Sequence, residues 1–188
     1  MGFYFFFKFW YNEIMKITIS GLGGVGKGTT SKILKDQINY QFLSSGDFFR
    51  QMAKEKNMTA YEFEKVVEKN PEIDLQIDQR QKKFGKENDN FIFDSRLGYF
   101  FIPDSFKIKL ICNEDTRLKR LQKRDGGTIK DIQKKEEERL KNVKQRYLKL
   151  YGIEDFLNDK NFDLIVDTEN KTPKEVSDEI LENIKNLV

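Results

Sequence analysis

The fold of this 188-residue chain can be inferred from one stretch, GLGGVGKGTT, which runs from Gly21 to Thr30. It nearly matches the phosphate-binding pattern G-x-x-x-x-G-K-[ST], but Gly28 stands where the pattern has Ser or Thr. The run KITIS (Lys16–Ser20) precedes it and predicts a strand, whereas SKILKDQI (Ser31–Ile38) follows it with helical spacing. In such a unit, backbone N–H groups and the helix N-terminus converge on phosphate oxygens. The stretch therefore predicts a nucleoside triphosphate site formed by Gly21, Gly24, Val25, Gly26, Lys27, Gly28, Thr29 and Thr30.

The rest of the chain alternates between apolar runs and helical segments. Further strands are predicted at Phe42–Leu43, Asn90–Asp94, Ile108–Cys112 and Phe162–Val166. The last two are so rich in apolar residues that we expect them to be buried on both faces. The final helix is predicted from Pro173 to Leu187, with Thr172 as its N-cap. This alternation predicts an α/β fold, in which helices cover both faces of a five-stranded parallel sheet.

Composition excludes several classes of function. The 34 Lys and Arg residues nearly balance 31 Asp and Glu, so the net charge of +3 does not indicate a nucleic-acid partner. Histidine is absent, which excludes Ser-His-Asp catalysis and His-ligated metal sites. The single cysteine, Cys112, cannot form an internal disulfide and indicates a reducing compartment, so we expect a cytoplasmic protein.

The beginning of the chain differs from the rest. In residues 1–11, MGFYFFFKFWY, eight side chains are aromatic. The run is shorter than a membrane span, which takes ~20 residues, and it lacks a signal-peptide cleavage site. We expect synthesis to begin at Met15, with residues 1–14 an extension that is not native and residues 15–188 a single domain. The alternative is an aromatic anchor at a membrane surface.

The ending GKGT resembles the loop of the nucleoside-monophosphate kinases, G-x-P-G-x-G-K-G-T, with Gly23 at the proline position. In that family the hydroxyl near the metal comes one residue later, at Thr29 here. Further motifs resemble the short, archaeal-type cytidylate kinases, and these are SSGDFFR (Ser44–Arg50), NPEIDLQIDQRQ (Asn70–Gln81), FIFDSRLG (Phe91–Gly98) and RYLKLYGI (Arg146–Ile153). The resemblance extends from Met15 to the C-terminus. One departure is Asp94-Ser95-Arg96, where family members often carry Glu-Gly-Arg.

The resemblance implies a P-loop kinase with ATP as donor, CMP or dCMP as acceptor and Mg²⁺ as cofactor. The γ-phosphoryl group would pass directly to an acceptor oxygen that is already anionic, so no strong general base is needed. An insertion at residues 47–87 would bind the acceptor, and a lid at about residues 121–138 would close on ATP. The acceptor-binding residues would be Ser45, Gly46, Asp47, Arg50, Asp78 and Arg96, while Thr29 and Asp94 would hold the metal.

Arginine supplies only 8 of the 34 basic residues, so its positions are informative. A planar guanidinium suits phosphate oxygens better than an ammonium does. Arg117, Arg120 and Arg124 share one predicted helical face. Arg139 and Arg146 share another, beyond the turn DGGTIK (Asp125–Lys130). Two such arms resemble the lid of the family, so the predicted catalytic residues are Lys27, Arg120, Arg124, Arg139 and Arg146. The alternative is surface ion pairing with Glu136–Glu138 or Asp125, which stays open above all for Arg117 and Arg80.

Selection of the base calls for a hydrogen-bond acceptor, because cytosine has an amino group where uracil has a carbonyl. Asp74 and Asp78 lie four residues apart on the predicted helix Pro71–Phe84, and either of them is a candidate. We favour Asp78. The alternative is that both are solvated charges on the helix surface.

Other functions remain open. Adenylate kinase, or another small-molecule P-loop kinase, would differ only in its acceptor. A GTP-dependent switch would need the motif N-K-x-D, and the nearest string, NKTP (Asn170–Pro173), has Pro in place of Asp. A non-catalytic interaction module would not need so many arginines suited to phosphate. We expect a monomer without a membrane partner, and the choice among CMP, dCMP and UMP stays open.

Overall fold

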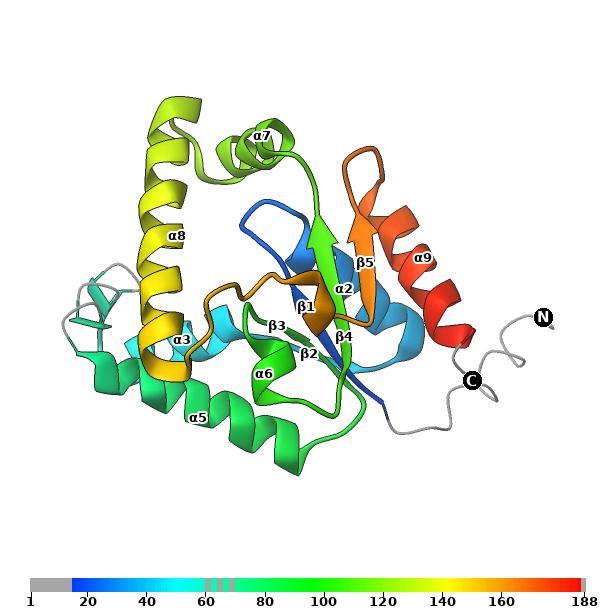
Figure 1. Cartoon of the computed structure of the whole chain (residues 1–188), viewed down its shortest axis with the longest axis horizontal. Coiled ribbons are helices and arrows are strands. Elements are labelled where there is room, and N and C mark those ends of the chain that lie inside the picture. Colours follow the sequence, from blue (N-terminus) through cyan, green and yellow to red (C-terminus); the bar gives the residue numbers. More distant parts are fainter. Residues whose placement is uncertain (1–14, 60–61, 64–65, 68–69, 187–188) are drawn as a thin grey trace.

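The structure is a computed structural model that describes residues 15–59, 62–63, 66–67 and 70–186. Five parallel strands form one sheet in the order β2-β3-β1-β4-β5 (Figure 1). The strands are β1 (Lys16–Ser20), β2 (Gln41–Ser44), β3 (Phe91–Asp94), β4 (Phe106–Ile111) and β5 (Leu164–Asp167). The five predicted strands are therefore confirmed, with shifts of a few residues at their ends. β1 lies in the centre, and the loop that follows it opens at the carboxyl edge of the sheet, where ligands of α/β proteins bind.

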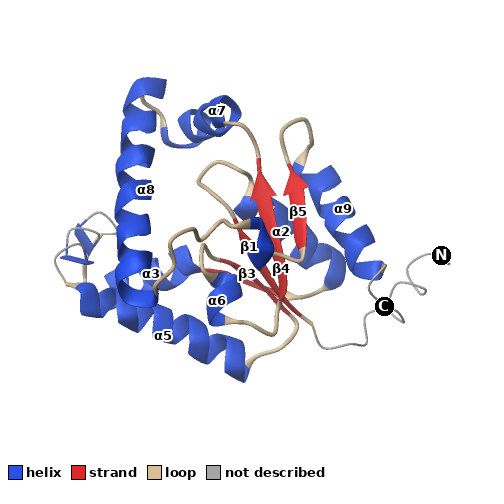
Figure 2. Ribbon diagram, in the orientation of Figure 1, coloured by secondary structure: helices blue, strands red, loops and turns tan. Residues whose placement is uncertain are grey.

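Helices cover both faces of the sheet (Figure 2). On one face, α2 (Lys27–Ile38) and α9 (Pro173–Lys185) pack against each other and against the sheet. Their buried side chains and those of the strands form one core, which includes Ile17, Ile19, Leu34, Ile108, Val176 and Ile180. The other face carries α6 (Gly98–Phe101), α8 (Ile129–Tyr151) and the segment with the short helix η1 (Asp159–Asn161). The core on this face includes Phe91, Phe93, Phe101, Tyr147 and Phe156.

Two helical pairs project from this sheet. The first follows β2 and consists of α3 (Ser45–Glu55) and α5 (Pro71–Glu87), which enclose a small core of their own with Met52, Phe63 and Ile77. The second follows β4 and consists of α7 (Glu114–Asp125) and α8. Gly126 and Gly127 between them adopt positive φ, and the Thr128 side chain caps α8, so the predicted turn is confirmed.

The expectation that both of the last strands are buried on two faces is only partly met. β5 lies at the edge of the sheet, where Ile165 is 38% exposed. In β4, which has a neighbour on each side, Ile108, Lys109 and Leu110 are buried, but Ile111 at its end is 40% exposed. The N-cap at Thr172 is confirmed, with a capping box to Glu175. The predicted extension, residues 1–14, and Leu187 lie outside the described residues. None of the helices in the described part of the chain has the length and apolarity to cross a membrane.

Candidate active site

The loop from Gly21 to Gly26 joins β1 to α2 at the carboxyl edge of the sheet. A Cβ at Gly21 would lie 2.5 Å from the carbonyl oxygen of Leu110, and one at Gly24 would lie 2.6 Å from that of Arg117. Neighbouring backbone therefore lies so close to the loop that only glycine fits at these two positions. The N-cap of α2 is Gly26, and no side chain caps the helix. Its first N–H groups are thus directed at the site where an anion would bind.

Lys27 lies at the first position of α2 and bends back over the loop. Its Nζ donates to the carbonyl oxygens of Gly21 and Leu22, at 3.0 Å each, and lies 3.9 Å from Oδ1 of Asp94. Burial lowers the pKa of Lys27, while the charge of Asp94 opposes that shift. The ammonium is therefore held over the loop by weak carbonyl acceptors, which a phosphate oxygen can replace.

Asp94 ends β3 beside the start of α2, and its Oδ2 would lie 3.7 Å from a Cβ at Gly28. Burial raises the pKa of this carboxyl, and the positive charges of Lys27 and Arg96 counteract it. The residue at position 28 thus faces a carboxylate at close range. Thr29, one residue later, is exposed and keeps its hydroxyl available.

Arg96 follows Asp94 by two residues and is partly buried. Burial lowers its pKa, and the charge of Arg139 lowers it further. Among the described residues, no carboxylate lies within ion-pair distance of its guanidinium. An arginine that is partly buried, next to another cation and not ion-paired with a carboxylate provides a binding site for an anion.

The predicted lid arginines do not all face this cluster. Arg139 and Arg146, both on α8, act on the pKa of Arg96. Arg146 also stacks on the ring of Tyr147, at 5.1 Å. On α7, in contrast, Arg120 donates to the hydroxyl and carbonyl oxygens of Thr168, at 3.0 and 2.7 Å. Arg124 forms two hydrogen bonds to the exposed Asp125, so the ion-pair alternative applies to it in this structure.

Arg117 has a role that neither sequence alternative described. It is 8% exposed, and its Nη1 donates to the carbonyl oxygen of Gly23 at 2.7 Å. Its side chain thereby ties α7 to the phosphate loop. Arg80 does form a surface ion pair, at 2.9 Å to Glu55.

The motif after β2 begins α3. Ser44 is its N-cap, with a capping box to Asp47, and Ser45 and Gly46 occupy its first turn. Nη2 of Arg50 lies 2.6 Å from Oδ1 of Asp47, and the arginine side chain is 63% exposed. In this structure Arg50 therefore points to its own helix and remains separate from Arg96.

Asp78 is 6% exposed. The alternative that it is a solvated charge on the helix surface is therefore wrong. It accepts hydrogen bonds from Gln81 on its own helix and from Tyr151 at the end of α8. The side chain of Asp74 lies outside the described part of the structure. Gln81 and Tyr151 belong to two of the quoted motifs, but the sequence does not predict that their side chains bind Asp78.

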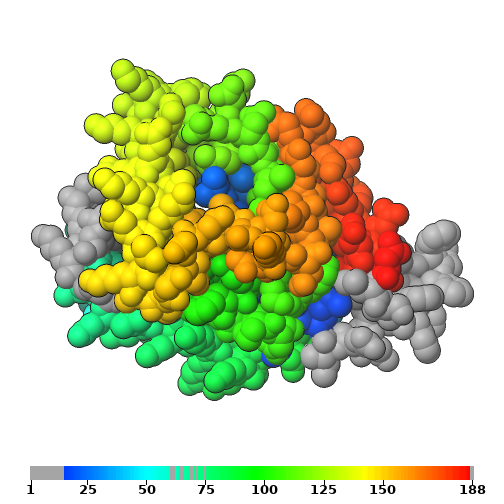
Figure 3. All heavy atoms as spheres, viewed as in Figure 1, coloured from blue at the N-terminus to red at the C-terminus, as the bar shows by residue number. Residues whose placement is uncertain are grey.

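The space-filling view shows where a ligand can approach (Figure 3). Atoms from the beginning of the described chain, coloured blue, are visible at the bottom of a hollow. This hollow lies between α7 and α8 on one side and the orange segment after α8 on the other.

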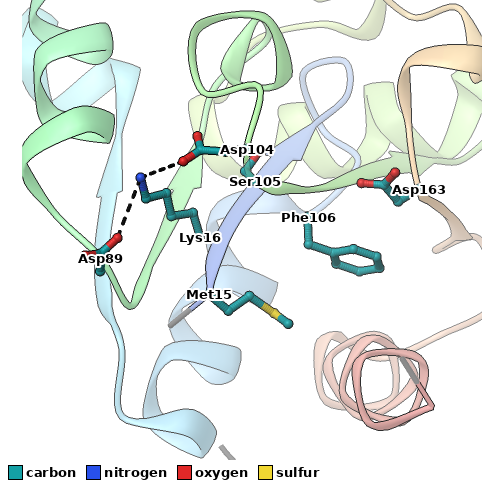
Figure 4. A pocket seen from close by; sticks show the side chains of 7 residues that line it. All are labelled: Met15, Lys16, Asp89, Asp104, Ser105, Phe106 and Asp163. Atoms are coloured by element: carbon teal, nitrogen blue, oxygen red, sulfur yellow. Dashed lines mark hydrogen bonds and ion pairs between the residues drawn. The ribbon is translucent and has the colours of Figure 1, made fainter. Parts of the chain in front are cut away.

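A second concavity lies at the opposite edge of the sheet, where the strands begin (Figure 4). Its lining includes Lys16, which pairs with Asp89 and Asp104 at 3.6 and 2.7 Å. The lysine is thus neutralised by two carboxylates. This concavity is remote from the glycine-rich loop and carries none of the predicted site residues.

Comparison with known proteins agrees with this geometry. Residues 17–141 match a family model described as an AAA domain. Two archaeal cytidylate kinases are similar along most of the chain. The protein from Methanosphaera stadtmanae is 37% identical, over 82% of this chain and 89% of its own. That from Methanobrevibacter smithii is 35% identical, over 91% of this chain and 99% of its own.

Two further similarities are partial. An S-adenosylmethionine-dependent nucleotide dehydratase of Lacinutrix mariniflava is 36% identical over 89% of this chain. The chain spans only 35% of the length of that relative. Among solved structures, the shikimate kinase from Acinetobacter baumannii aligns over 93% of this chain and 94% of its own, with a TM-score of 0.61 and 15% identity. That likeness establishes the P-loop kinase fold alone.

The similarity to these cytidylate kinases extends over most of this chain and most of theirs. The chain therefore belongs to the P-loop kinases and, among them, to the archaeal-type cytidylate kinases.

Proposed function

We propose that the protein phosphorylates CMP or dCMP by direct transfer of the γ-phosphoryl group of ATP. The observation that carries this proposal is the pair of cations Lys27 and Arg96, whose charges both act on Asp94 at the end of β3. Lys27 covers the glycine-rich loop, and no carboxylate among the described residues lies within ion-pair distance of Arg96, although the charges of Asp94 and Glu136 act at longer range. Two anions can therefore be held next to each other at the end of β3, as phosphoryl transfer between two nucleotides requires.

The donor site is the loop with the first turn of α2. The residues proposed to bind ATP are Gly21, Gly24, Val25, Gly26, Lys27, Gly28, Thr29 and Thr30. Lys27 would exchange its two carbonyl acceptors for phosphate oxygens and neutralise the charge that develops during transfer. Arg139 and Arg146 are proposed to act on the migrating group. Arg120 and Arg124 would have to leave Thr168 and Asp125 to join them, which makes lid movement part of the proposal.

The acceptor site is proposed to lie between α3, α5 and the end of β3. Arg96 and Arg50 would hold the monophosphate, with Ser45, Gly46 and Asp47 shaping the start of α3. Asp78 would accept a hydrogen bond from the amino group of cytosine. Uracil would present a carbonyl oxygen to the same carboxylate, so that two acceptors would face each other and the uracil oxygen would lack a donor.

Mg²⁺ is proposed as the cofactor, held by Asp94 and the hydroxyl of Thr29. The site fits this ion, because its donors are hard oxygens and because Asp94 is a partly buried carboxylate beside the phosphate loop. Mg²⁺ bound there would offset the negative charge of the ATP phosphates.

The helical pairs give the proposal its domain organisation. Residues 47–87 would act as the acceptor-binding insertion and about residues 121–138 as the lid. We propose a monomer that acts in the cytoplasm on ATP and CMP or dCMP, with residues 1–14 not required.

The proposal is tested with protein that begins at Met15, ATP, Mg²⁺ and CMP. We expect stoichiometric formation of CDP and ADP, and little ATP hydrolysis when CMP is omitted. A protein that hydrolyses ATP equally with and without CMP, or binds it without turnover, would instead be a nucleotide-dependent switch. Asp78→Asn should bring the kcat/KM values for CMP and UMP closer together, since an amide can donate as well as accept.

A further inference from the structure

Three buried side chains form a chain of hydrogen bonds from the sheet to Asp78. The hydroxyl of Ser95 donates to Oε1 of Gln81 at 2.7 Å, and Nε2 of Gln81 donates to Oδ1 of Asp78 at 2.9 Å. Ser95 and Gln81 are each 3% exposed, and Asp78 is 6% exposed. The hydroxyl of Tyr151 donates to the other carboxylate oxygen, Oδ2.

The hydrogen bonds of this network run in a fixed direction from donor to acceptor. Asp78 as a carboxylate only accepts hydrogen bonds, so Gln81 must turn its amino group toward it. The carbonyl oxygen of Gln81 then needs a donor, and Ser95 supplies one. A flipped amide would place two oxygens against each other beside Asp78. Buried side-chain networks in which every group is satisfied hold a single geometry.

Ser95 itself is anchored to the centre of the sheet. Its N–H donates to the carbonyl oxygen of Ile19, and its carbonyl oxygen accepts from the hydroxyl of Ser20, at 3.2 and 2.8 Å. Both partners belong to β1. Helix α5 also packs on the sheet through Phe84, whose ring lies 4.8 Å from that of Phe91. The hydrogen bond from Ser95 to Gln81, three residues before Phe84, adds a directional polar link from Asp78 to the segment that follows β3.

The network also lies near two arginines proposed to bind phosphate groups, Arg96 for the acceptor and Arg146 for the migrating group. Burial raises the pKa of Tyr147, the charges of Arg146 and Arg96 lower it, and the charge of Asp78 raises it. Tyr147 therefore lies within the electrostatic reach of both the phosphate-binding cations and Asp78. Ser95 immediately precedes Arg96, so one short segment sets the position of the proposed phosphate ligand and, through Gln81, that of the proposed base ligand.

We infer that Ser95 is a positioning residue for acceptor selection, which acts through Gln81 to hold the Asp78 carboxylate where it discriminates cytosine from uracil. This inference rests on the proposed function. Ser95 touches neither nucleotide in this role, and its effect passes entirely through the hydrogen bonds to Asp78.

The experiment compares the ratio of kcat/KM for CMP to that for UMP in the wild type and in Ser95→Ala. The alanine variant should lower this ratio about 3- to 10-fold, as expected for the loss of one hydrogen bond, and leave KM for ATP unchanged. Ser105→Ala is the matched control. Ser105 is also buried, and its hydroxyl donates to the carbonyl oxygen of Ile102 at 2.7 Å, at the opposite edge of the sheet. Ser105→Ala should lower the thermal stability about as much as Ser95→Ala does, but it should keep the wild-type ratio of kcat/KM for CMP to that for UMP.

A double-mutant cycle separates positioning from a merely structural role. In the Asp78→Asn background, Ser95→Ala should have no further effect on the ratio. Gln81→Met removes the amide at similar length and should lower the ratio as Ser95→Ala does, which also covers the case in which the alanine variant does not fold.

The inference is overturned if Ser95→Ala and Gln81→Met keep the wild-type ratio, or if Ser105→Ala lowers it equally. A wild-type enzyme that does not prefer CMP to UMP overturns it as well, while leaving CMP phosphorylation intact. A wild-type enzyme that uses AMP better than CMP overturns the proposed function itself.

Discussion

The carboxylate of Glu136, on α8, lies directly against Gly23 of the phosphate loop. A Cβ built on Gly23 would lie only 2.6 Å from Oε2 of Glu136. Glu136 is 18% exposed at its side chain and lies 3.6 Å from Arg139, and its charge acts on the pKa of Lys27. The helix proposed as a lid therefore places a negative charge beside the loop proposed to receive phosphates.

This contact predicts that Glu136 competes with ATP. Glu136→Gln should lower KM for ATP about 3- to 10-fold by removing the repulsion between like charges. Glu137→Gln is the control, because Glu137 is exposed on the same helix and bonds only to Gln133 among the described residues. Steady-state kinetics at low and high salt measure both variants. A KM for ATP that rises in Glu136→Gln would mean that the carboxylate helps to hold the lid closed over ATP.

Arg117 is expected to maintain the shape of the loop. Arg117→Met removes the hydrogen bond to the Gly23 carbonyl and keeps most of the volume, so it should lower stability by about 1–3 kcal/mol. It should also raise KM for ATP, while KM for CMP stays near that of the wild type. Lys119→Ala, at an exposed position of the same helix, should change neither quantity. Thermal unfolding and kinetics with each substrate varied in turn provide the test, and a variant that raised only KM for CMP would contradict the assignment.

Lys27 should contribute mainly to the transition state. Lys27→Ala is expected to lower kcat by about 10²- to 10³-fold, because a cation that neutralises the migrating phosphoryl group is lost. The circular dichroism spectrum should remain that of the wild type. Lys32→Ala removes an exposed lysine from the same helix and should retain full activity. Near-normal turnover of Lys27→Ala would remove the loop from the mechanism.

Donor and acceptor arginines should separate kinetically. Arg50→Ala should raise KM for CMP far more than KM for ATP. Arg124→Ala, in contrast, should raise KM for ATP and lower kcat. Both side chains now pair with an exposed aspartate nearby, Asp47 and Asp125, so their loss should cost little stability. If Arg50→Ala instead raised KM for ATP and left KM for CMP unchanged, the assignment of the donor and acceptor sub-sites would be reversed.

The sequence predicted the parts of this molecule that depend on local patterns. The loop from Gly21 to Thr30, the five strands and the cap at Thr172 each follow from residues close together in the chain. The edge position of β5 was missed because it depends on the order of strands in the sheet. A run of apolar residues looks the same at the edge as in the centre.

Side-chain partners far apart in the sequence were harder to predict. Arg117 and Arg120 lie three residues apart on the same helix, yet one bonds to Gly23 and the other to Thr168. Nothing in the local sequence distinguishes them, because the choice depends on which carbonyl lies within reach. The same holds for Asp78, whose partner Tyr151 lies 73 residues further along the chain.

The identity of the acceptor is decided by comparing five nucleoside monophosphates under one set of conditions. CMP, dCMP, UMP, dUMP and AMP are supplied one at a time to protein that begins at Met15, with saturating ATP and Mg²⁺, and kcat/KM is measured for each. We expect CMP and dCMP to be the best acceptors, UMP to be at least about 5-fold poorer, from the cost of an unsatisfied buried acceptor, and AMP to be poor. A higher kcat/KM for AMP than for CMP would contradict the assignment and identify an adenylate kinase instead.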